Sequence, residues 1–263
     1  MIIGLVFIIG LIFGSFINAF VWRIHKNKNW VSDRSICPQC KHVLQAKYLI
    51  PVASWLWLRG KCAYCKKSIS WQYPVVELLT GLIFAVSYLL WPASFDIYQI
   101  ILFILWLKII VLLISLMVYD IKWMLLPDKL VVPLTVLSLL FVLLLNVNPV
   151  DLAGILFALF GGAILFGIFY ALFQLSKGAW IGGGDVKIAF ALGLLAGTPI
   201  NVILLLFMAS VIGTITALPT LISKKNALKM KIPFGPFLIV ATVIVFFWGN
   251  NIINWYTTQI LLL

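Results

Sequence analysis

Charged residues are scarce in this chain. Only 10% of its 263 residues are charged, 64% are hydrophobic, and the mean hydropathy is +1.16. A water-soluble globular domain of this size does not sustain such a composition, because its surface needs many more polar side chains. The composition therefore excludes a soluble protein and predicts an all-α polytopic membrane protein, since helices satisfy their own backbone groups in lipid.

Polar interruptions are also few, so the apolar runs can be counted against the roughly 20 helical residues that cross a bilayer. About eight transmembrane helices are expected, with the sixth run short. The chain shows no internal repeat and no low-complexity tract. The expected spans are residues 2–22, 74–91, 97–119, 130–146, 152–175, 186–197, 200–222 and 234–251.

Acidic residues are rarer than basic ones: seven Asp and Glu stand against 19 Lys and Arg, a net charge of +12. Ten basic residues fall between Arg23 and Lys67. Most of the others flank the third to eighth spans, at Lys122, Lys129, Lys177, Lys187, Lys224, Lys225, Lys229 and Lys231.

The positive-inside rule makes these basic loops cytoplasmic and turns both termini outward. The net charge is then a consequence of topology. It also favours contact with anionic lipid headgroups, whereas nucleic acid is not an expected partner. Because no basic residue precedes the first apolar run, that run is expected to be an uncleaved anchor and not a secretory signal peptide.

Cysteine occurs only four times, always in the one sizeable polar segment, residues 23–72. The order is C-x2-C, 21 residues, and C-x2-C, in "CPQC" and "CAYC". This pattern predicts a closed tetrahedral zinc site, which is structural because zinc catalysis needs an open coordination position. Two disulfides are the alternative, disfavoured in a reducing cytosol. His25 and His42 are expected to be solvated. The predicted ligands are Cys37, Cys40, Cys62 and Cys65.

Most of the acids have a structural explanation. Asp33 belongs to the polar segment, while Asp96 and Asp151 lie in outward turns where a solvated carboxylate costs little. Asp128 follows Pro127 at the start of the fourth span, where a helix N-cap is favoured over catalysis. Glu77 lies a turn inside the second span. It could cap that helix, form an ion pair with Arg59 or Lys61, or take part in the function of the polar segment.

Asp120 and Asp185 are the two acids that such structural explanations fit least well. The first ends the third span and the second opens the sixth, so both are expected at the cytoplasmic membrane face. Asp185 alone could be a helix N-cap. However, three glycines precede it, in "GGGDVK". Glycine suits unusual dihedrals or close backbone approach, which favours a substrate strand lying alongside. Two neighbouring carboxylates share a proton, as in an aspartic protease.

The chain closely resembles the type IV prepilin peptidases, which are bifunctional leader peptidases and N-methyltransferases. The resemblance covers almost the entire length. A departure is the absence, in "RIHKNKNW", of the proline often found there. The motifs are "GSFINAFVWR" (14–23), "RSICPQC" (34–40), "LIPVASWLWLRGKCAYC" (49–65), "YPVVELLTG" (73–81), "YDIKWMLLPDKL" (119–130), "GGGDVK" (182–187) and "PFGPFL" (233–238).

The resemblance implies that Asp120 and Asp185 form the catalytic pair of a GxGD-type aspartyl protease in the cytoplasmic membrane of a prokaryote. It also implies that the four cysteines bind zinc in a cytoplasmic domain linked to methyl transfer from S-adenosylmethionine. Only through the resemblance are Glu77 and Gly60 candidates for that activity, because no G-x-G-x-x-G dinucleotide fingerprint is present. The expected substrate is a prepilin or pseudopilin precursor.

The expected organisation is a first transmembrane helix at 1–22, a zinc-binding domain at 23–73 and the peptidase domain at 74–263. The substrate's leader junction is expected to bind as an extended strand between the glycines at 182–184 and the Pro-Gly break in "KMKIPFGPFLIV". A transporter using the same acids is the alternative. It is disfavoured because such acids are expected near the bilayer midplane at a repeat interface. A zinc-stabilised scaffold would leave the glycines and acids unexplained.

Overall fold

The described part of the chain is almost entirely helical. The computed structural model describes residues 1–29, 34–147, 150–223 and 232–259, so the predictions for Asp33 and for the lysines between 224 and 231 lie outside the described residues. The helices are α1 (Ile2–His25), η1 (Ala46–Leu49, a 3₁₀-helix), α2 (Ala53–Trp57), α3 (Gln72–Leu89), α4 (Ile97–Trp123), α5 (Asp128–Leu145), α6 (Leu152–Ser176), α7 (Gly183–Ala196), α8 (Pro199–Ser223) and α9 (Gly235–Gln259).

The predicted all-α polytopic membrane architecture is confirmed. Among the described residues, seven helices are long and apolar enough to cross a membrane: α1, α3, α4, α5, α6, α8 and α9. The sixth predicted run, residues 186–197, is the helix α7 (Gly183–Ala196), which has only 14 residues and is not among these seven. At 1.5 Å per residue it is about 21 Å long, short of a hydrocarbon core of about 30 Å. Apolar side chains on most of its faces make α7 a buried helix, and its last six residues, 191–196, are all buried.

The chain folds as two compact units, Met1–Ser94 and Phe95–Leu263. In the first unit, α1 and α3 cross at very short range. A Cβ on Gly10 would lie 2.7 Å from the Cα of Gly81, and a Cβ on Gly14 would lie 2.5 Å from the Cα of Glu77. Such small-xxx-small spacing lets two membrane helices bring their backbones together. This close packing also places Glu77 against the side of α1 that carries Gly14.

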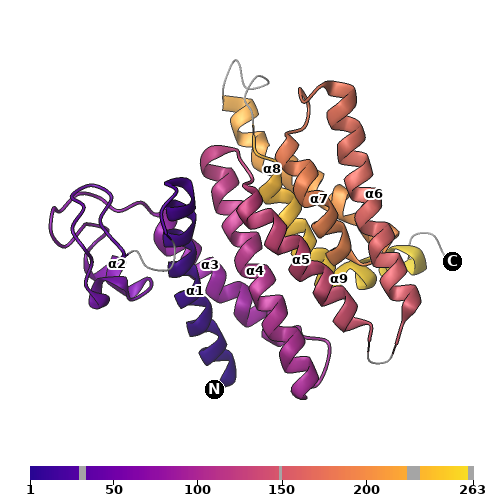
Figure 1. The fold of residues 1–263 in the computed structure, drawn as a ribbon, viewed down its shortest axis with the longest axis horizontal. Helices are drawn as coiled ribbons and strands as arrows, with labels where there is room; N and C mark the ends of the chain where they lie inside the picture. The colour runs from indigo at the N-terminus through magenta and orange to yellow at the C-terminus, as the bar shows by residue number, and fades with distance from the viewer. Residues whose placement is uncertain (30–33, 148–149, 224–231, 260–263) are drawn as a thin grey trace. The chain divides into compact units, whose positions relative to one another are not determined.

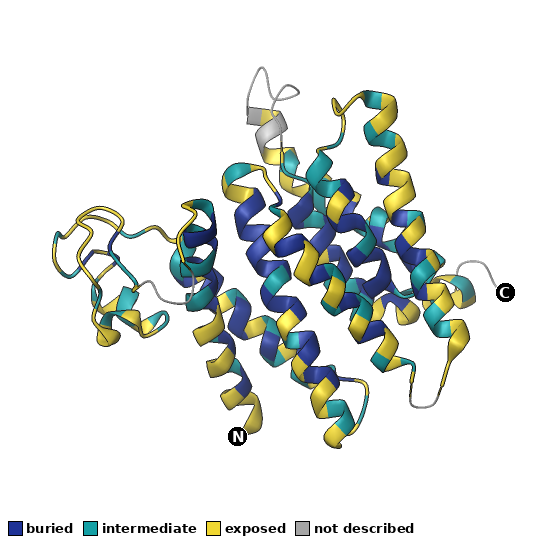
Figure 2. Ribbon diagram, viewed as in Figure 1, coloured by how far each residue is buried: buried dark blue, intermediate teal, exposed yellow. Residues whose placement is uncertain are grey.

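The second unit is built around α4 and α7. Figure 2 shows the buried residues concentrated on these helices, while α6 and α8 carry many exposed apolar side chains. The indole of Trp106 on α4 is fully buried and stacks on Phe246 of α9 with ring centroids 3.9 Å apart. Phe141 of α5 completes this aromatic cluster. The exposed apolar surface on the outer helices is what lipid contact requires.

The helix α7 is held in place by contact with α5, α6, α8 and α9 (Figure 1). Its tightest contact is with α6, where a Cβ on Gly193 would lie 2.6 Å from the carbonyl oxygen of Gly161. No side chain fits there, so the two helices meet backbone to backbone. This packing fixes α7, and with it the position of Asp185 near its first turn.

Candidate active site and metal site

Asp120 lies in the last turn of α4, three residues before the last helical residue, Trp123. The helix stops at Met124, which adopts the left-handed conformation with φ 51° and donates its backbone N–H to the carbonyl oxygen of Asp120 at 2.8 Å. The Asp120 side chain is only 5% exposed. Its Oδ2 atom has no hydrogen-bond partner among the described residues. A buried carboxylate oxygen in this state is uncommon, because buried polar atoms are nearly always hydrogen-bonded.

Asp185 lies in the first turn of α7, as its third residue. The N-cap is Gly182, with extended dihedrals of φ −70° and ψ 142°. The N-cap interpretation of Asp185 is therefore wrong, because the helix starts at Gly183, three residues before the expected start at 186. The backbone N–H of Gly182 donates to the Asp185 carboxylate, and the N–H of Asp185 donates to the carbonyl oxygen of Gly182 at 3.1 Å. A carboxylate at this position is favoured by the positive end of the helix dipole.

The two carboxylates meet at Gly235, the first residue of α9. A Cβ at Gly235 would lie 2.6 Å from Oδ2 of Asp120 and 3.5 Å from Oδ1 of Asp185. The two oxygens are therefore no more than about 6 Å apart, within the range over which two carboxylates influence each other's ionisation. The backbone N–H of Gly235 donates to Asp120. The end of α4 and the starts of α7 and α9 thus converge on one pair of acids.

The three glycines before Asp185 do not have the unusual backbone dihedrals that the sequence suggested. Positive φ angles among the described glycines occur at other positions, so residues 182–184 do not need glycine for unusual dihedrals. Only Gly184 is tightly packed, with its Cβ position 3.1 Å from Leu126. A Cβ on Gly182 would have the Asp185 carboxylate as its nearest neighbour, at 3.7 Å. The space beside Gly182 therefore adjoins the acids, as a substrate strand would require.

Asp128 is not an N-cap. Pro127 occupies that position and Asp128 is the first residue of α5. Its carboxylate instead pairs with the ammonium group of Lys187 on α7, with 2.7 Å between Oδ1 and Nζ. The two side chains are 68% and 50% exposed, so the pair is solvated. Such pairs contribute about 0–1 kcal/mol. The other two acids of this unit do act as N-caps, Asp96 for α4 and Asp151 for α6.

An Asp128→Asn substitution is therefore expected to have a small effect. Losing an exposed ion pair should lower the leader-cleavage rate by less than about fivefold. Lys187→Gln should cost the same amount, and the double variant should cost no more than either single one, because all three lack the same pair. Cleavage kinetics of the three variants in detergent check this. A loss of 100-fold in Asp128→Asn alone would instead place Asp128 in the catalytic machinery.

The four cysteines come together in the first unit. All four Sγ atoms lie within 4.8 Å of one another, and those of Cys37 and Cys65 are 3.9 Å apart. Four sulfurs about 2.3 Å from a tetrahedral zinc ion would be roughly 3.8 Å apart, so the group could hold a metal ion. All four cysteines are free, which excludes the two-disulfide alternative in this structure. His42 is outside the group, and its ring packs on Tyr64 at 3.7 Å.

Each C-x2-C stretch forms the same turn. The N–H of Cys37 donates to the carbonyl oxygen of His42, and the N–H of Cys62 donates to that of Lys67, both at 2.9 Å. Lys41 and Lys66 both have positive φ, 59° and 58°. Burial acts to raise the pKa of the Cys37 thiol, but hydrogen bonds from the backbone and neighbouring thiols bring it down to about 7. The repeated turn explains how two distant pairs present four sulfurs to one point.

Glu77 has a partner that the sequence did not indicate. The side chain is buried, and its Oε2 accepts the backbone N–H of Val52 at 2.6 Å. Val52 has φ 58°, a strained value for a β-branched residue. Among the described ion pairs, none joins Glu77 to Arg59 or Lys61. The carboxylate thus holds a strained turn just before α2.

Gly60 is glycine for a conformational reason. Its φ is 68°, in the left-handed region, and an added Cβ would lie 2.9 Å from the indole of Trp55. Its carbonyl oxygen accepts the N–H of Ile69 at 2.7 Å, which ties the turn to the second cysteine loop. Both features give Gly60 a structural role.

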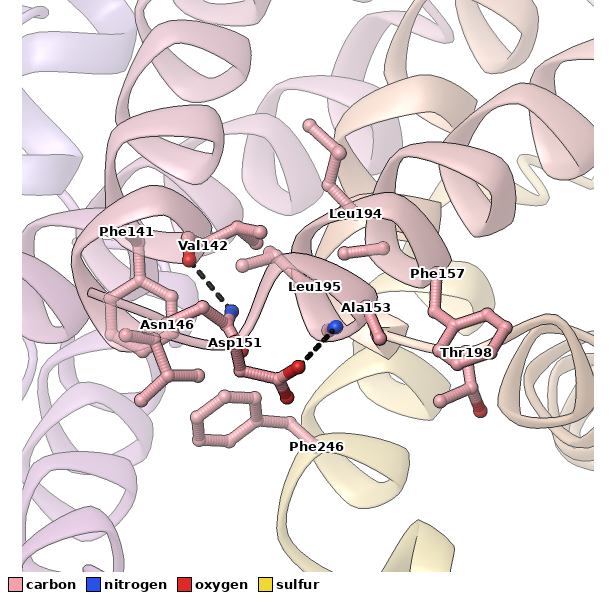
Figure 3. Close-up of a pocket in the computed structure, with 14 residues that line it drawn as sticks. Phe141, Val142, Asn146, Asp151, Ala153, Phe157, Leu194, Leu195, Thr198 and Phe246 are labelled. Carbon is pink, nitrogen blue, oxygen red and sulfur yellow. Dashed lines mark hydrogen bonds between the residues drawn. The ribbon is translucent and has the colours of Figure 1, made fainter. Parts of the chain in front are cut away.

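A separate cavity of about 320 Å³ lies at the far end of α7 from Asp185. It is lined by the end of α5, the start of α6, the end of α7 with the connection at 197–198, and Phe246 (Figure 3). Its polar side chains are already engaged, because Asn146 donates to the carbonyl oxygen of Val142 and Asp151 accepts from Gly154. The remaining lining is mostly apolar. This cavity has no part in the acidic site.

Three contacts of these sites were missed by the sequence analysis: Gly235 against the two acids, Lys187 against Asp128, and Val52 against Glu77. Of these three contacts, only that of Gly235 was suggested by the local sequence, because Gly235 precedes Pro236 at the start of a predicted span. The other two contacts join residues far apart in the chain and depend on how the helices pack.

Comparison with known proteins places the chain in a family. Residues 8–91 match the model of the bacterial Peptidase A24 N-terminal domain, and residues 107–218 match that of the type IV leader peptidase family. A prepilin leader peptidase/N-methyltransferase from Aeromonas salmonicida (strain A449) is 34% identical, covering 98% of this chain and 94% of the relative. Proteins of the same name from Bacillus subtilis (strain 168) and Neisseria gonorrhoeae are 29% and 31% identical, covering 97% and 96% of this chain, and 97% and 93% of those relatives.

The fold and the paired acids define a polytopic membrane protein of the aspartic peptidase class. The chain belongs to the type IV leader peptidase family. No solved structure was found to match it. The transporter alternative gains no support from these relatives, and the acids lie at helix ends, in the last turn of α4 and the first turn of α7.

Proposed function

We propose that this protein removes the basic leader peptide from a prepilin or pseudopilin with Asp120 and Asp185 as its catalytic pair, and N-methylates the new terminal residue. One observation carries the assignment of the site: two acids 65 residues apart in sequence meet at Gly235, and one of their oxygens is buried with no hydrogen-bond partner in the described part of the chain. Family membership and the names of the relatives support the reaction.

The paired carboxylates supply both roles that peptide hydrolysis needs. The ionised carboxylate takes a proton from a water molecule as the water oxygen bonds to the scissile carbonyl carbon, and the protonated partner gives its proton to the carbonyl oxygen. The tetrahedral intermediate then collapses and the C–N bond breaks. The leaving nitrogen receives the proton that the first carboxylate took from the water, and a hydroxyl of the intermediate returns a proton to the second carboxylate. The starts of α7 and α9 direct their backbone N–H groups at the two carboxylates, which stabilises negative charge there.

The cysteine cluster is proposed to hold one zinc ion with a structural role. Its four soft ligands leave no open coordination position, and the spacing of the sulfurs fits a tetrahedral ion. The segment 23–73 that carries the cluster is proposed as a cytoplasmic domain that serves methyl transfer, with 1–22 as its membrane anchor and 74–263 as the peptidase part. Because the segment is small, the metal supplies stability that its core cannot.

Methyl transfer is assigned to this domain through the family alone. S-adenosylmethionine is the proposed methyl donor, a second substrate whose methyl group goes to the new amino terminus. Glu77 and Gly60 stay as candidate residues for this step. Their contacts with Val52 and Trp55 indicate that they shape the binding surface rather than react.

The site is proposed to face the cytoplasm. Lys122, Lys129 and Lys187 lie close in sequence to the helix ends that carry the two acids, and basic residues mark the cytoplasmic side of a membrane protein. The substrate's apolar helix would then lie in the membrane, its leader in the cytosol, and the junction beside Gly182.

Co-expression with a pseudopilin precursor tests this function. Mass measurement of the recovered pseudopilin should show loss of the leader and a new terminus one methyl group heavier. The matched control is the same precursor expressed without the protein, which should stay intact. A precursor that stays uncut beside the wild-type protein, in a strain where a known relative cuts it, would contradict the proposal.

A further inference from the structure

The short helix α2 has an apolar outer face. Ala53, Leu56 and Trp57 lie three and four residues apart, so they share one side of the helix. All three are exposed, and the Trp57 side chain is 76% exposed (Figure 2). Leu49 and Ile50, just before the helix, are exposed as well. A helix at the surface of a soluble domain carries polar side chains on this side. These five residues, here called the α2 face, form an apolar surface on the exterior of the first unit.

The other side of α2 is fastened to the start of α3. The backbone N–H of Val52, the residue before α2, donates to Oε2 of Glu77 at 2.6 Å. The ring of Trp55 packs on that of Trp71 with the centroids 4.1 Å apart, and Nε1 of Trp55 donates to the carbonyl oxygen of Ile69 at 3.3 Å. Trp71 is the N-cap of α3. The helix α2 is therefore held beside the first turns of α3.

These contacts give α2 a depth in the membrane. The candidate span α3 has 18 residues, so it is about 27 Å long at 1.5 Å per residue. Because the hydrocarbon core is about 30 Å thick, neither end of α3 can project far beyond it. Glu77 is the sixth residue of α3, so Val52 meets α3 within about 7 Å of its first residue. Interfacial helices bury their apolar face about 5–10 Å into the boundary between headgroups and acyl chains. The α2 face lies at that level.

The charge around the α2 face has one sign. Residues 34–76 contain seven Lys and Arg, all exposed, and no Asp or Glu. Lys47, Arg59 and Lys61 are the basic residues nearest to the face in sequence. Anionic lipid headgroups attract such side chains. A second copy of this segment, or a basic leader peptide, would be repelled by them. The charge therefore favours lipid as the occupant of the α2 face.

We propose that the α2 face is a membrane anchor, which rests in the interfacial layer of the bilayer crossed by α1 and α3, with anionic headgroups against the basic residues around it. Trp57 and Trp71 then occupy the level at which tryptophan is enriched in membrane proteins. The two cysteine loops precede and follow α2 in the chain, so the anchor keeps both close to the membrane surface. Under the proposed function, which the anchor itself does not require, the amino terminus to be methylated appears at that surface.

Photo-crosslinking in vesicles tests the anchor. Benzoylphenylalanine replaces Trp57 or, separately, Leu56 in the full chain, which is reconstituted into vesicles of phosphatidylcholine and phosphatidylglycerol. Gln39 is the control position, because it is polar, exposed and inside the first C-x2-C pair. Mass spectrometry after irradiation should show lipid adducts at positions 57 and 56 with a yield about tenfold above that at position 39. Phosphatidylglycerol should exceed its share of the vesicle lipid among these adducts.

Each result decides the proposal. Equal lipid yields at positions 57 and 39 would overturn the anchor. So would adducts at position 57 with a second copy of the chain, or with an added precursor, in place of lipid. Adducts in proportion to the vesicle composition would overturn the role of the basic residues.

Two crosslinking positions keep the test valid if one variant folds poorly. Leu56 and Trp57 are both exposed, and replacing either leaves the contact of Trp55 with Trp71 in place. Both positions free of lipid adducts would therefore count against the anchor itself. The catalytic pair is tested separately, since that assignment fails only if an Asp120→Asn or Asp185→Asn variant stays active.

Discussion

Asp120→Asn and Asp185→Asn are each expected to lose leader cleavage by at least about 1000-fold while the protein stays folded. Asparagine has nearly the shape of aspartate but neither shares nor transfers the proton that hydrolysis moves. Because the two acids act as one unit, the double variant should be no slower than either single variant. Initial rates on a pseudopilin precursor in detergent, with thermal unfolding of each variant, measure this.

Asp96→Asn is the matched control for this pair. Asp96 is an acid at the opposite end of the same helix α4, and its Oδ1 accepts the backbone N–H of Gln99 at 2.8 Å. Asparagine caps a helix nearly as well as aspartate, so both cleavage and stability should be retained. If Asp120→Asn or Asp185→Asn cleaves at a rate near that of Asp96→Asn, the assignment of the catalytic pair is wrong.

The sequence predicted the helices well because lipid leaves few alternatives. Every long apolar run became a helix, since backbone groups in a bilayer must be satisfied within the segment. The prediction was least accurate at α7, where the short run 186–197 was counted as a span, although the helix has only 14 residues. Apolarity alone does not distinguish lipid from a protein interior. The Gly193 contact with α6 shows that protein surrounds this helix.

The composition of the site was also predictable, but its geometry was not. Rare acids at two helix ends and two C-x2-C pairs stand out in an apolar chain, and the structure brings each set together. Helix starts are harder to predict. An N-cap was favoured for Asp128 and was the alternative considered for Asp185, but these are the first and third residues of their helices. The contact of Gly235 with both acids depends on three helix ends converging. No single sequence window records that arrangement.

One zinc ion per chain is expected, and a Cys37→Ser, Cys62→Ser double variant is expected to lose it completely. These two cysteines are the buried members of the cluster, one from each C-x2-C pair, so the double variant leaves one sulfur in each loop. Structural zinc contributes about 10–16 kcal/mol in small zinc-binding peptides. The loops around residues 36–43 and 61–68 should therefore become sensitive to proteases. Metal analysis and limited proteolysis of the purified protein check this.

Leader cleavage should depend much less on the zinc than the stability of these loops does, because the proposed catalytic acids belong to the other compact unit. His42→Ala is the control: its ring packs on Tyr64 outside the group of four sulfurs, so zinc should stay bound. Wild-type protein without zinc would refute the site, and zinc retained by the double cysteine variant would show that other residues bind it. A double variant that loses zinc and cleavage in equal proportion would instead show that the peptidase site depends on the metal-stabilised loops.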